Sequence, residues 1–161
     1  MKRLLAAGTV LAASLILVAC GGGPANTATK SAGSTLSVKS IAGLGDVLVD
    51  AKGKALYASD VEANGHVRCV DGCTAFWQPL TLDSGPPVAP PRAGKLGVVK
   101  RPDGSRQVTA AGKLLYTFSE DSPGKVTGNG FTDDFDGRHF TWNAVLAGGQ
   151  KAGSSGNAGG Y

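Results

Sequence analysis

Gly53-Lys54-Ala55-Leu56-Tyr57 and Gly112-Lys113-Leu114-Leu115-Tyr116 are nearly identical stretches, and they decide how this chain of 161 residues folds. After each tyrosine an acidic, glycine-containing segment leads to a tryptophan, which is Trp77 in the first copy and Trp142 in the second. An internal repeat of this kind indicates two similar supersecondary units that share one core. We therefore predict two repeats, at about residues 45–80 and 105–147.

The segments around these stretches have the composition of short strands, and turn residues such as Pro102-Asp103-Gly104 separate them. No long segment has the periodicity of an amphipathic helix, and the proline-rich residues 81–94 predict an irregular connector. We expect an all-β fold, a small two-repeat domain of short antiparallel hairpins at residues 38–147. The predicted strands are 46–50, 54–58, 96–100, 107–109, 113–118 and 139–145.

Both flanks of this domain differ from it in composition. Residues 20–37 consist largely of Gly, Ser, Thr, Ala and Asn, which predicts a flexible tether. Residues 148–161 repeat that composition, and we predict a disordered tail.

The amino terminus has the features of an export signal. Lys2 and Arg3 precede an apolar run from Leu4 to Val18, and a small residue, Ala19, ends it. That run is too short to cross a hydrocarbon core, which needs about 20 apolar residues. We predict a signal peptide at residues 1–19.

The end of the signal, Leu17-Val18-Ala19-Cys20, resembles the lipobox of bacterial lipoproteins. The resemblance implies cleavage before Cys20 and lipidation of its sulfur, for example with palmitate. Each buried CH₂ group contributes about 0.8 kcal/mol, so two or three acyl chains would anchor the protein stably. The expected location is the extracytoplasmic face of the bacterial cell membrane or of the outer membrane. An ordinary secretory signal with an incidental cysteine is the alternative.

Charge gives little support to a nucleic-acid partner. The formal net charge is +4, and two of the positive charges, Lys2 and Arg3, leave with the signal. The remaining basic residues are scattered and form no stripe with interleaved aromatic residues, so we expect no nucleic-acid binding.

The second repeat carries a family motif. Tyr116-Thr117-Phe118-Ser119-Glu120-Asp121 resembles the Tyr-x-aromatic-x-x-Asp motif of a bacterial lipoprotein family known as the secreted repeat of unknown function. The first repeat departs from the motif, with Ser59 at the aromatic position and Glu62 at the acidic end, so the resemblance assigns that motif no role there. It implies no established activity. The residues of this sequence that match the family are Tyr57, Trp77, Tyr116, Phe118, Asp121 and Trp142.

Cys69 and Cys73 remain once Cys20 is assigned to the lipid. In an exported protein such a pair usually forms a disulfide, and the Asp71-Gly72 turn between them can bring their Cα atoms within bridging distance. Thiolates and an imidazole also suit copper(I) or zinc, so a metal site of His66, Cys69 and Cys73 and a redox-active pair stay open as alternatives.

The aromatic family residues are expected in the core, because buried aromatic side chains dominate small β domains. Stacking on a glycan or a haem is the alternative for them. Asp121 is expected to accept backbone N–H groups in its loop. The run Asp133, Asp134, Asp136 and Gly137 predicts a solvated acidic turn rather than a calcium loop, and His139 is expected to point outward.

No nucleophile elbow, phosphate loop or dinucleotide motif is present, so nothing favours an enzyme and no catalytic residue is assigned. We expect a lipid-anchored, non-enzymatic binding or interaction module without a cofactor. Its partner would be the membrane together with an envelope protein or a small ligand. The alternative is an envelope protein that handles copper or haem, or carries out redox chemistry, through Cys69 and Cys73.

Overall fold

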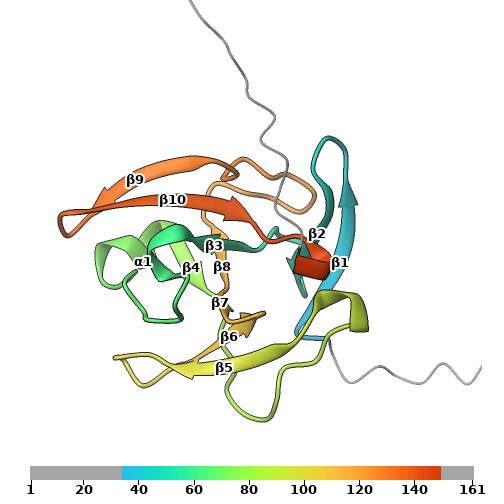
Figure 1. Ribbon diagram of the computed structural model, residues 1–161, viewed down its shortest axis with the longest axis horizontal. Coiled ribbons are helices and arrows are strands. Elements are labelled where there is room, and N and C mark those ends of the chain that lie inside the picture. Colours follow the sequence, from blue (N-terminus) through green and yellow to red (C-terminus); the bar gives the residue numbers. More distant parts are fainter. Residues whose placement is uncertain (1–33, 150–161) are drawn as a thin grey trace, which may run out of the picture.

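The computed structural model describes residues 34–149 and confirms an all-β domain of short antiparallel strands (Figure 1). The predicted signal peptide, the predicted lipidation site Cys20 and residues 150–161 of the predicted tail lie outside the described residues. No helix of the described part is both long and apolar enough to cross a membrane.

The described residues form ten strands, one short α-helix and three 3₁₀ turns. The strands are β1 Leu36–Ile41, β2 Gly45–Asp50, β3 Tyr57–Ser59, β4 Trp77–Pro79, β5 Leu96–Lys100, β6 Arg106–Ala110, β7 Lys113–Leu114, β8 Tyr116–Phe118, β9 Phe131–Phe135 and β10 Arg138–Ala144. The helix is α1 Gly72–Phe76, and the 3₁₀ turns are η1 Asp60–Glu62, η2 Pro91–Ala93 and η3 Ala147–Gly149.

Three strands, β1, β4 and β9, were not among the predicted ones. β1 begins at Leu36, inside the segment predicted as tether. The sequence did not indicate this strand because only Leu36 and Val38 stand out among small and polar residues there. β9 has the sequence Phe-Thr-Asp-Asp-Phe, whose central carboxylates conceal the apolar alternation.

The strand predicted at 113–118 is divided at Leu115 into β7 and β8. The backbone of Leu115 leaves the strand ladder because its N–H donates to Val108 O at 3.1 Å and its carbonyl accepts from Leu80 N at 2.9 Å. The strand predicted at 54–58 is shortened in the same way, since Leu56 bonds Leu48 and Val145. The two Gly-Lys-x-Leu-Tyr stretches therefore share one pattern of backbone hydrogen bonds.

The five-stranded sheet has the order β4-β8-β3-β10-β9, and all its pairs are antiparallel. Its centre is the pair β3–β8, in which Tyr57 lies opposite Tyr116. β4 of the first repeat pairs with β8 of the second, and β10 of the second repeat pairs with β3 of the first. The two repeats have therefore exchanged their tryptophan strands.

The register of this exchange is the same in both directions. Trp77 lies opposite Phe118, which is the second residue after Tyr116. Trp142 lies opposite Ser59, which is the second residue after Tyr57. The equivalence indicates that the sequence repeat is also a structural repeat.

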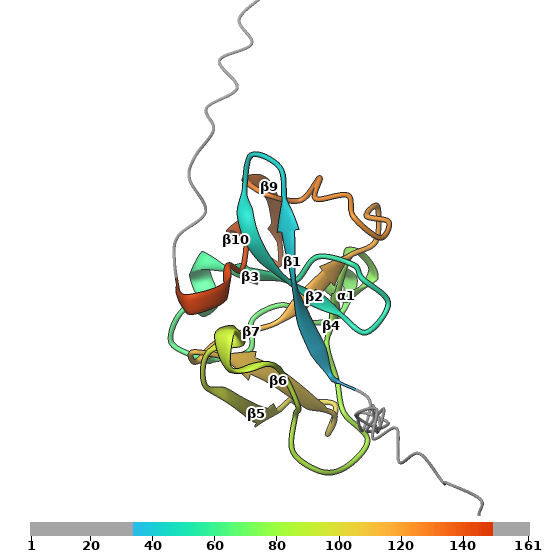
Figure 2. The ribbon, with the colours of Figure 1, turned by 90° about the vertical axis from the view of Figure 1, so that its right-hand side faces the viewer.

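Each repeat also begins with a hairpin, β1–β2 in the first and β5–β6 in the second. The two hairpins lie apart, at the right and at the bottom of Figure 1, and the turned view in Figure 2 separates them as well. The second hairpin continues into β7 to form a three-stranded sheet. The structural repeats thus start earlier in the chain than the predicted ones.

The core has two parts. One is aliphatic and packs the hairpins against the residues that open each repeat, with Leu36, Leu48, Leu56, Val108, Leu115 and Val145 at its centre. The other is aromatic and fills the space around the exchanged strands, with Tyr57, Trp77, Tyr116, Phe118, Phe140 and Trp142. The aromatic part leads to the candidate site.

Candidate functional site

Trp77 and Trp142 stack on each other at the centre of the aromatic core. Their ring centroids are 4.1 Å apart, with an angle of 9° between the rings, and neither residue is exposed. Phe118 stacks on Trp77 at 4.4 Å, and Phe140 lies parallel to Trp142 at 5.6 Å. Because the tryptophans come from exchanged strands, the stack joins the two repeats face to face.

Asp133 binds both indole groups with one carboxylate. Trp77 Nε1 donates to Oδ2 at 2.7 Å, and Trp142 Nε1 donates to Oδ1 at 2.9 Å. A buried N–H without an acceptor would be costly, so this carboxylate satisfies two donors at once. The prediction of a solvated acidic turn was wrong for Asp133, which lies half-buried on β9, whereas Asp136 and Gly137 do form the turn, with φ of 51° and 68°.

The two central tyrosines bond acidic residues in a reciprocal manner. The hydroxyl of Tyr57 donates to Asp121 Oδ2, and Tyr116 Oη donates to Glu62 Oε1 at 3.0 Å. In each bond, the tyrosine and the carboxylate come from different repeats. Glu62 therefore fills in the first repeat the place that Asp121 fills in the second, although it departs from the family motif.

The pKa of both tyrosines is raised well above the usual range. Burial is the largest cause in each case, followed by the hydrogen bond to Asp121 for Tyr57 and by the negative charge of Glu62 for Tyr116. Both tyrosines therefore stay neutral donors.

Asp121 also fixes the loop that follows β8. Its Oδ1 accepts the backbone N–H of Thr127 at 2.8 Å and the Thr127 hydroxyl at 2.6 Å. The next residue, Gly128, passes so close to the core that a Cβ there would lie 2.8 Å from the Trp77 ring and 3.1 Å from the Tyr57 ring. Glycine is therefore required where this loop crosses the aromatic core.

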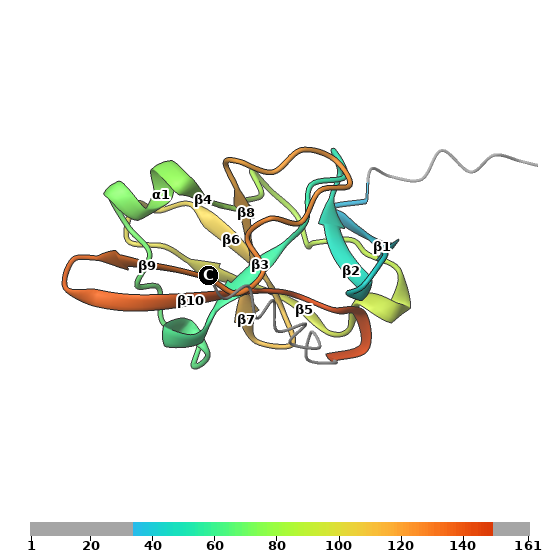
Figure 3. The ribbon, with the colours of Figure 1, turned by 90° about the horizontal axis from the view of Figure 1, so that it is seen from above.

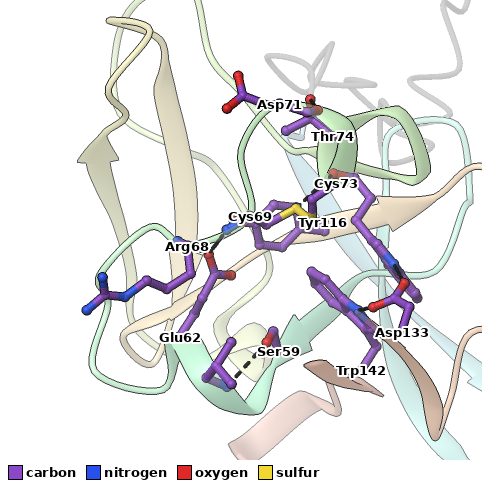
Figure 4. The surroundings of a disulfide bond; sticks show 12 residues. Ser59, Glu62, Arg68, Cys69, Asp71, Cys73, Thr74, Tyr116, Asp133 and Trp142 are labelled. Carbon is purple, nitrogen blue, oxygen red and sulfur yellow. Dashed lines mark hydrogen bonds between the residues drawn. A yellow bond between two sulfur atoms is a disulfide. The ribbon is translucent and has the colours of Figure 1, made fainter. Parts of the chain in front are cut away.

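The predicted disulfide Cys69–Cys73 is confirmed, with a Cα–Cα distance of 5.3 Å and both residues buried. Figure 4 shows it beside the ring of Tyr116, with Glu62 reaching toward the backbone at Cys69. Glu62 Oε1 accepts the N–H groups of Arg68 and Cys69 at 2.5 and 2.8 Å. The disulfide thus closes a segment that is already tied to the core.

This oxidised pair supplies no thiolate, which the alternative metal site with His66 needs. His66 itself is exposed, and its backbone N–H donates a hydrogen bond to Asn64 Oδ1 at 3.1 Å. Among residues 34–149, no group of three or more His, Cys, Asp or Glu side chains is placed to hold a metal ion.

A buried arginine completes the surroundings of Tyr116. Arg101, only 3% exposed, donates to Gln107 Oε1 at 2.6 Å and to the Cys69 carbonyl at 2.6 Å. It also reaches Tyr116 Oη at 3.2 Å. Neither Arg101 nor Gln107 was singled out from the sequence, because an isolated Arg or Gln gives no signal of burial.

An open groove lies between α1 and the β9–β10 hairpin, which occupy the same end of the molecule in Figures 1 and 3. Its volume is about 560 Å³, and apolar atoms dominate its surface. Four phenylalanines and four polar residues line it: Phe76, Phe118, Phe131, Phe135, Glu120, Thr127, Asp133 and Asp134. Its size falls in the range of small-ligand sites.

Two side chains of the groove are unusually exposed for their type. Phe76 is 49% exposed and Phe131 is 42% exposed, and Val88 at 44% is the other large apolar residue of the described chain with comparable exposure. The sequence could have indicated one wall, because the alternation in β9 places Phe131, Asp133 and Phe135 on one face. Phe76 carried no such signal.

The predicted site residues are thus divided between the core and one loop. Tyr57, Trp77, Tyr116 and Trp142 are fully buried, and Phe118 is the one aromatic family residue that also reaches the groove. Asp121 does not line the groove itself but accepts a hydrogen bond from the backbone N–H of Thr127, which does. His139 is exposed on β10, where its Nδ1 lies 3.1 Å from Asp134 Oδ1.

Comparison with known proteins identifies the second repeat. Residues 97–145 match the model of a protein family described as a secreted repeat of unknown function, which confirms the resemblance seen in the sequence. The match begins in β5 and ends just after β10, so it covers the second structural repeat together with its opening hairpin. The family description agrees with a location outside the cytoplasm. No curated protein and no solved structure matches the chain.

Proposed function

We propose that this protein is a lipid-anchored, non-enzymatic binding module of the cell envelope, and that its ligand occupies the aromatic groove. The observation that carries the proposal is the exposure of Phe76 and Phe131 toward one cavity of about 560 Å³. Clustered exposed apolar side chains in a concave surface are typical of ligand sites.

The walls of the groove are held in place before any ligand binds. The disulfide at Cys73 precedes Phe76 in α1, and Asp121 fixes the loop that carries Thr127. Asp133 ties the β9 wall to both tryptophans. A rigid site loses little conformational entropy on binding, which favours affinity.

The lipid anchor is proposed from the sequence. The basic residues Lys2 and Arg3, the apolar run and Cys20 support attachment at the outer face of a membrane. The low-complexity residues that follow Cys20 would hold the domain away from the lipid surface. A tethered module of this kind would retain its ligand or partner at the envelope.

Binding is tested with three small aromatic probes, 4-phenylbutylammonium, 4-phenylbutanol and 4-phenylbutyrate. They share one apolar body and differ in charge. The full chain is titrated in nonionic detergent, with detergent alone as reference, and the fluorescence of Trp77 and Trp142 is followed. The ring centroids of Trp77 and Phe131 are 6.1 Å apart, so a probe bound at Phe131 should change the tryptophan emission. We expect a saturable response to at least one probe.

The Phe131→Ala variant should lose this response, whereas Val88→Ala removes an equally exposed apolar residue that does not line the groove and should keep it. Near-ultraviolet circular dichroism would show that both variants retain the tryptophan stack. A response that survives in Phe131→Ala, or no response to any of the three probes, would refute the groove as the binding site.

The anchor is tested separately by growing bacteria that express the full chain with an alkyne-tagged palmitate analogue. The wild-type protein should become labelled and enter the detergent phase. Cys20→Ser should do neither, and labelling of that variant would contradict lipidation at Cys20.

A further inference from the structure

We propose that the ligand of the aromatic groove is a small organic cation, an ammonium or guanidinium group carried on an apolar body. This inference rests on the proposed binding function and adds the chemistry of the ligand. It follows from the charges at the groove, from its aromatic walls and from its lack of a free side-chain donor.

The charged residues that line the groove are all acidic. They are Glu120, Asp133 and Asp134, and none of the eight lining residues is basic. Asp133 is occupied because each of its oxygens accepts an indole N–H. Glu120 remains as the carboxylate that can meet a ligand, because strand alternation puts the Asp134 side chain on the other face of β9, where it lies opposite His139.

Glu120 has a weak partner within the described residues. It is exposed, and its one hydrogen bond comes from the Ser119 hydroxyl at 3.5 Å. Asp133 adds its negative charge to the groove although both of its oxygens already accept indole N–H groups. A ligand cation can therefore pair with Glu120 without displacing a strong bond.

The walls suit the same kind of ligand. The ring centroids of Phe131 and Phe118 are 5.3 Å apart, and those of Phe76 and Phe135 are 6.1 Å apart, with the rings tilted in both pairs. Exposed aromatic faces attract a cation that comes within about 6 Å of the ring centroid, and the attraction grows when the cation is desolvated. The rings also bury the apolar body of the ligand.

Other ligand classes fit less well. An anion would meet the carboxylates of Glu120 and Asp133 and no basic side chain. A glycan needs donors as well as acceptors, but the hydroxyl of Thr127 is already donated to Asp121 at 2.6 Å. A cation brings its own charge and, in most forms, its own N–H donors to a groove that offers acceptors.

The three phenylbutyl probes test the inference by calorimetry on the full chain in the same detergent. We expect 4-phenylbutylammonium to bind at least about tenfold more tightly than the alcohol, and the carboxylate to bind most weakly. Glu120→Gln should weaken binding of the cation about three- to tenfold and leave the alcohol unchanged. Asp83→Asn, which removes an exposed carboxylate that does not line the groove, should change neither.

The outcomes separate this inference from the proposed function. Equal affinities for cation and alcohol, both lost in Phe131→Ala, would leave the groove as a binding site and overturn the preference for a cation. Tighter binding of the carboxylate would overturn it too. Failure of all three probes to bind would refute both.

Discussion

Tyr57 lies opposite Tyr116 in the register of β3 and β8, and the hydroxyl of each donates to the carboxylate that follows the other tyrosine. These carboxylates, Asp121 and Glu62, are buried together with the tyrosines. Each repeat therefore supplies the other with both a neighbouring strand and a buried acceptor. The two repeats form one cooperative unit rather than two linked ones.

The buried tyrosines should resist ionisation. Burial and the neighbouring carboxylates raise the pKa of Tyr57 and Tyr116, whereas in the unfolded chain a tyrosine loses its proton at about pH 10. Their contribution to stability is fully present below about pH 10 and is lost as the pH rises toward the higher folded-state pKa. The third tyrosine of the chain is Tyr161, and the Tyr161→Phe variant removes it so that absorbance reports Tyr57 and Tyr116 alone. The denaturant midpoint of this variant should decrease as the pH rises above about 10, and tyrosinate absorbance should develop only with unfolding. Absorbance that develops near pH 10 in the folded protein would contradict this.

Asp133→Ala should destabilise the domain by about 1–3 kcal/mol, because it leaves the indole N–H groups of Trp77 and Trp142 without their acceptor. Asp134→Ala removes the adjacent, exposed carboxylate and should change the free energy of unfolding by no more than about 0.5 kcal/mol. Denaturant unfolding followed by tryptophan fluorescence measures both. Equal effects of the two substitutions would show that the bridge contributes nothing.

Gly128→Ala should cost about 1–3 kcal/mol, since a Cβ at that position would lie 2.8 Å from the Trp77 ring in a packed core. Gly72→Ala is the matched control, because a Cβ there meets nothing within 4 Å and its φ is not positive. In α1 that substitution should be neutral or slightly stabilising. Thermal unfolding of the two variants compares them directly.

Replacing both Cys69 and Cys73 with Ala should lower the free energy of unfolding by about 2 kcal/mol. This is the stabilisation expected when a disulfide that closes so short a loop reduces the entropy of the unfolded chain. Its larger effect should be local, on the segment between the disulfide and Phe76. Amide hydrogen exchange across α1 should become faster, and binding of groove probes should weaken. Unchanged exchange in α1 would mean that Glu62 and the core hold this segment without the disulfide.

The repeats made the fold class predictable, but not the pairing of the strands. Gly-Lys-x-Leu-Tyr stretches and period-two segments indicate which residues form strands and which face is apolar. They do not distinguish Trp77 pairing with its own repeat from Trp77 pairing with Phe118, because both arrangements bury the same residues. The exchange depends on tertiary contacts that local patterns do not encode.

The candidate site was less predictable for a related reason. The Asp71-Gly72 pair and the predicted export signal indicated the disulfide, which depends on local geometry. Asp133 looked like a solvated charge, because its acceptor role exists only once two distant indoles meet. Likewise, Phe76 is exposed at the end of α1, which its apolar character alone does not reveal.

The strand exchange also predicts that neither repeat folds alone. A fragment of residues 1–88 would lack β8 and β10, the partners of β4 and β3, and residues 89–161 would lack β3 and β4 in turn. Each would also leave a buried tyrosine or carboxylate without its partner. We expect little near-ultraviolet circular dichroism from either fragment and recovery of the signal of the Trp77–Trp142 stack on mixing. The cut between residues 88 and 89 lies outside every strand, so each fragment keeps its own strands whole. A native signal from one isolated fragment would therefore show that the repeats do not depend on each other.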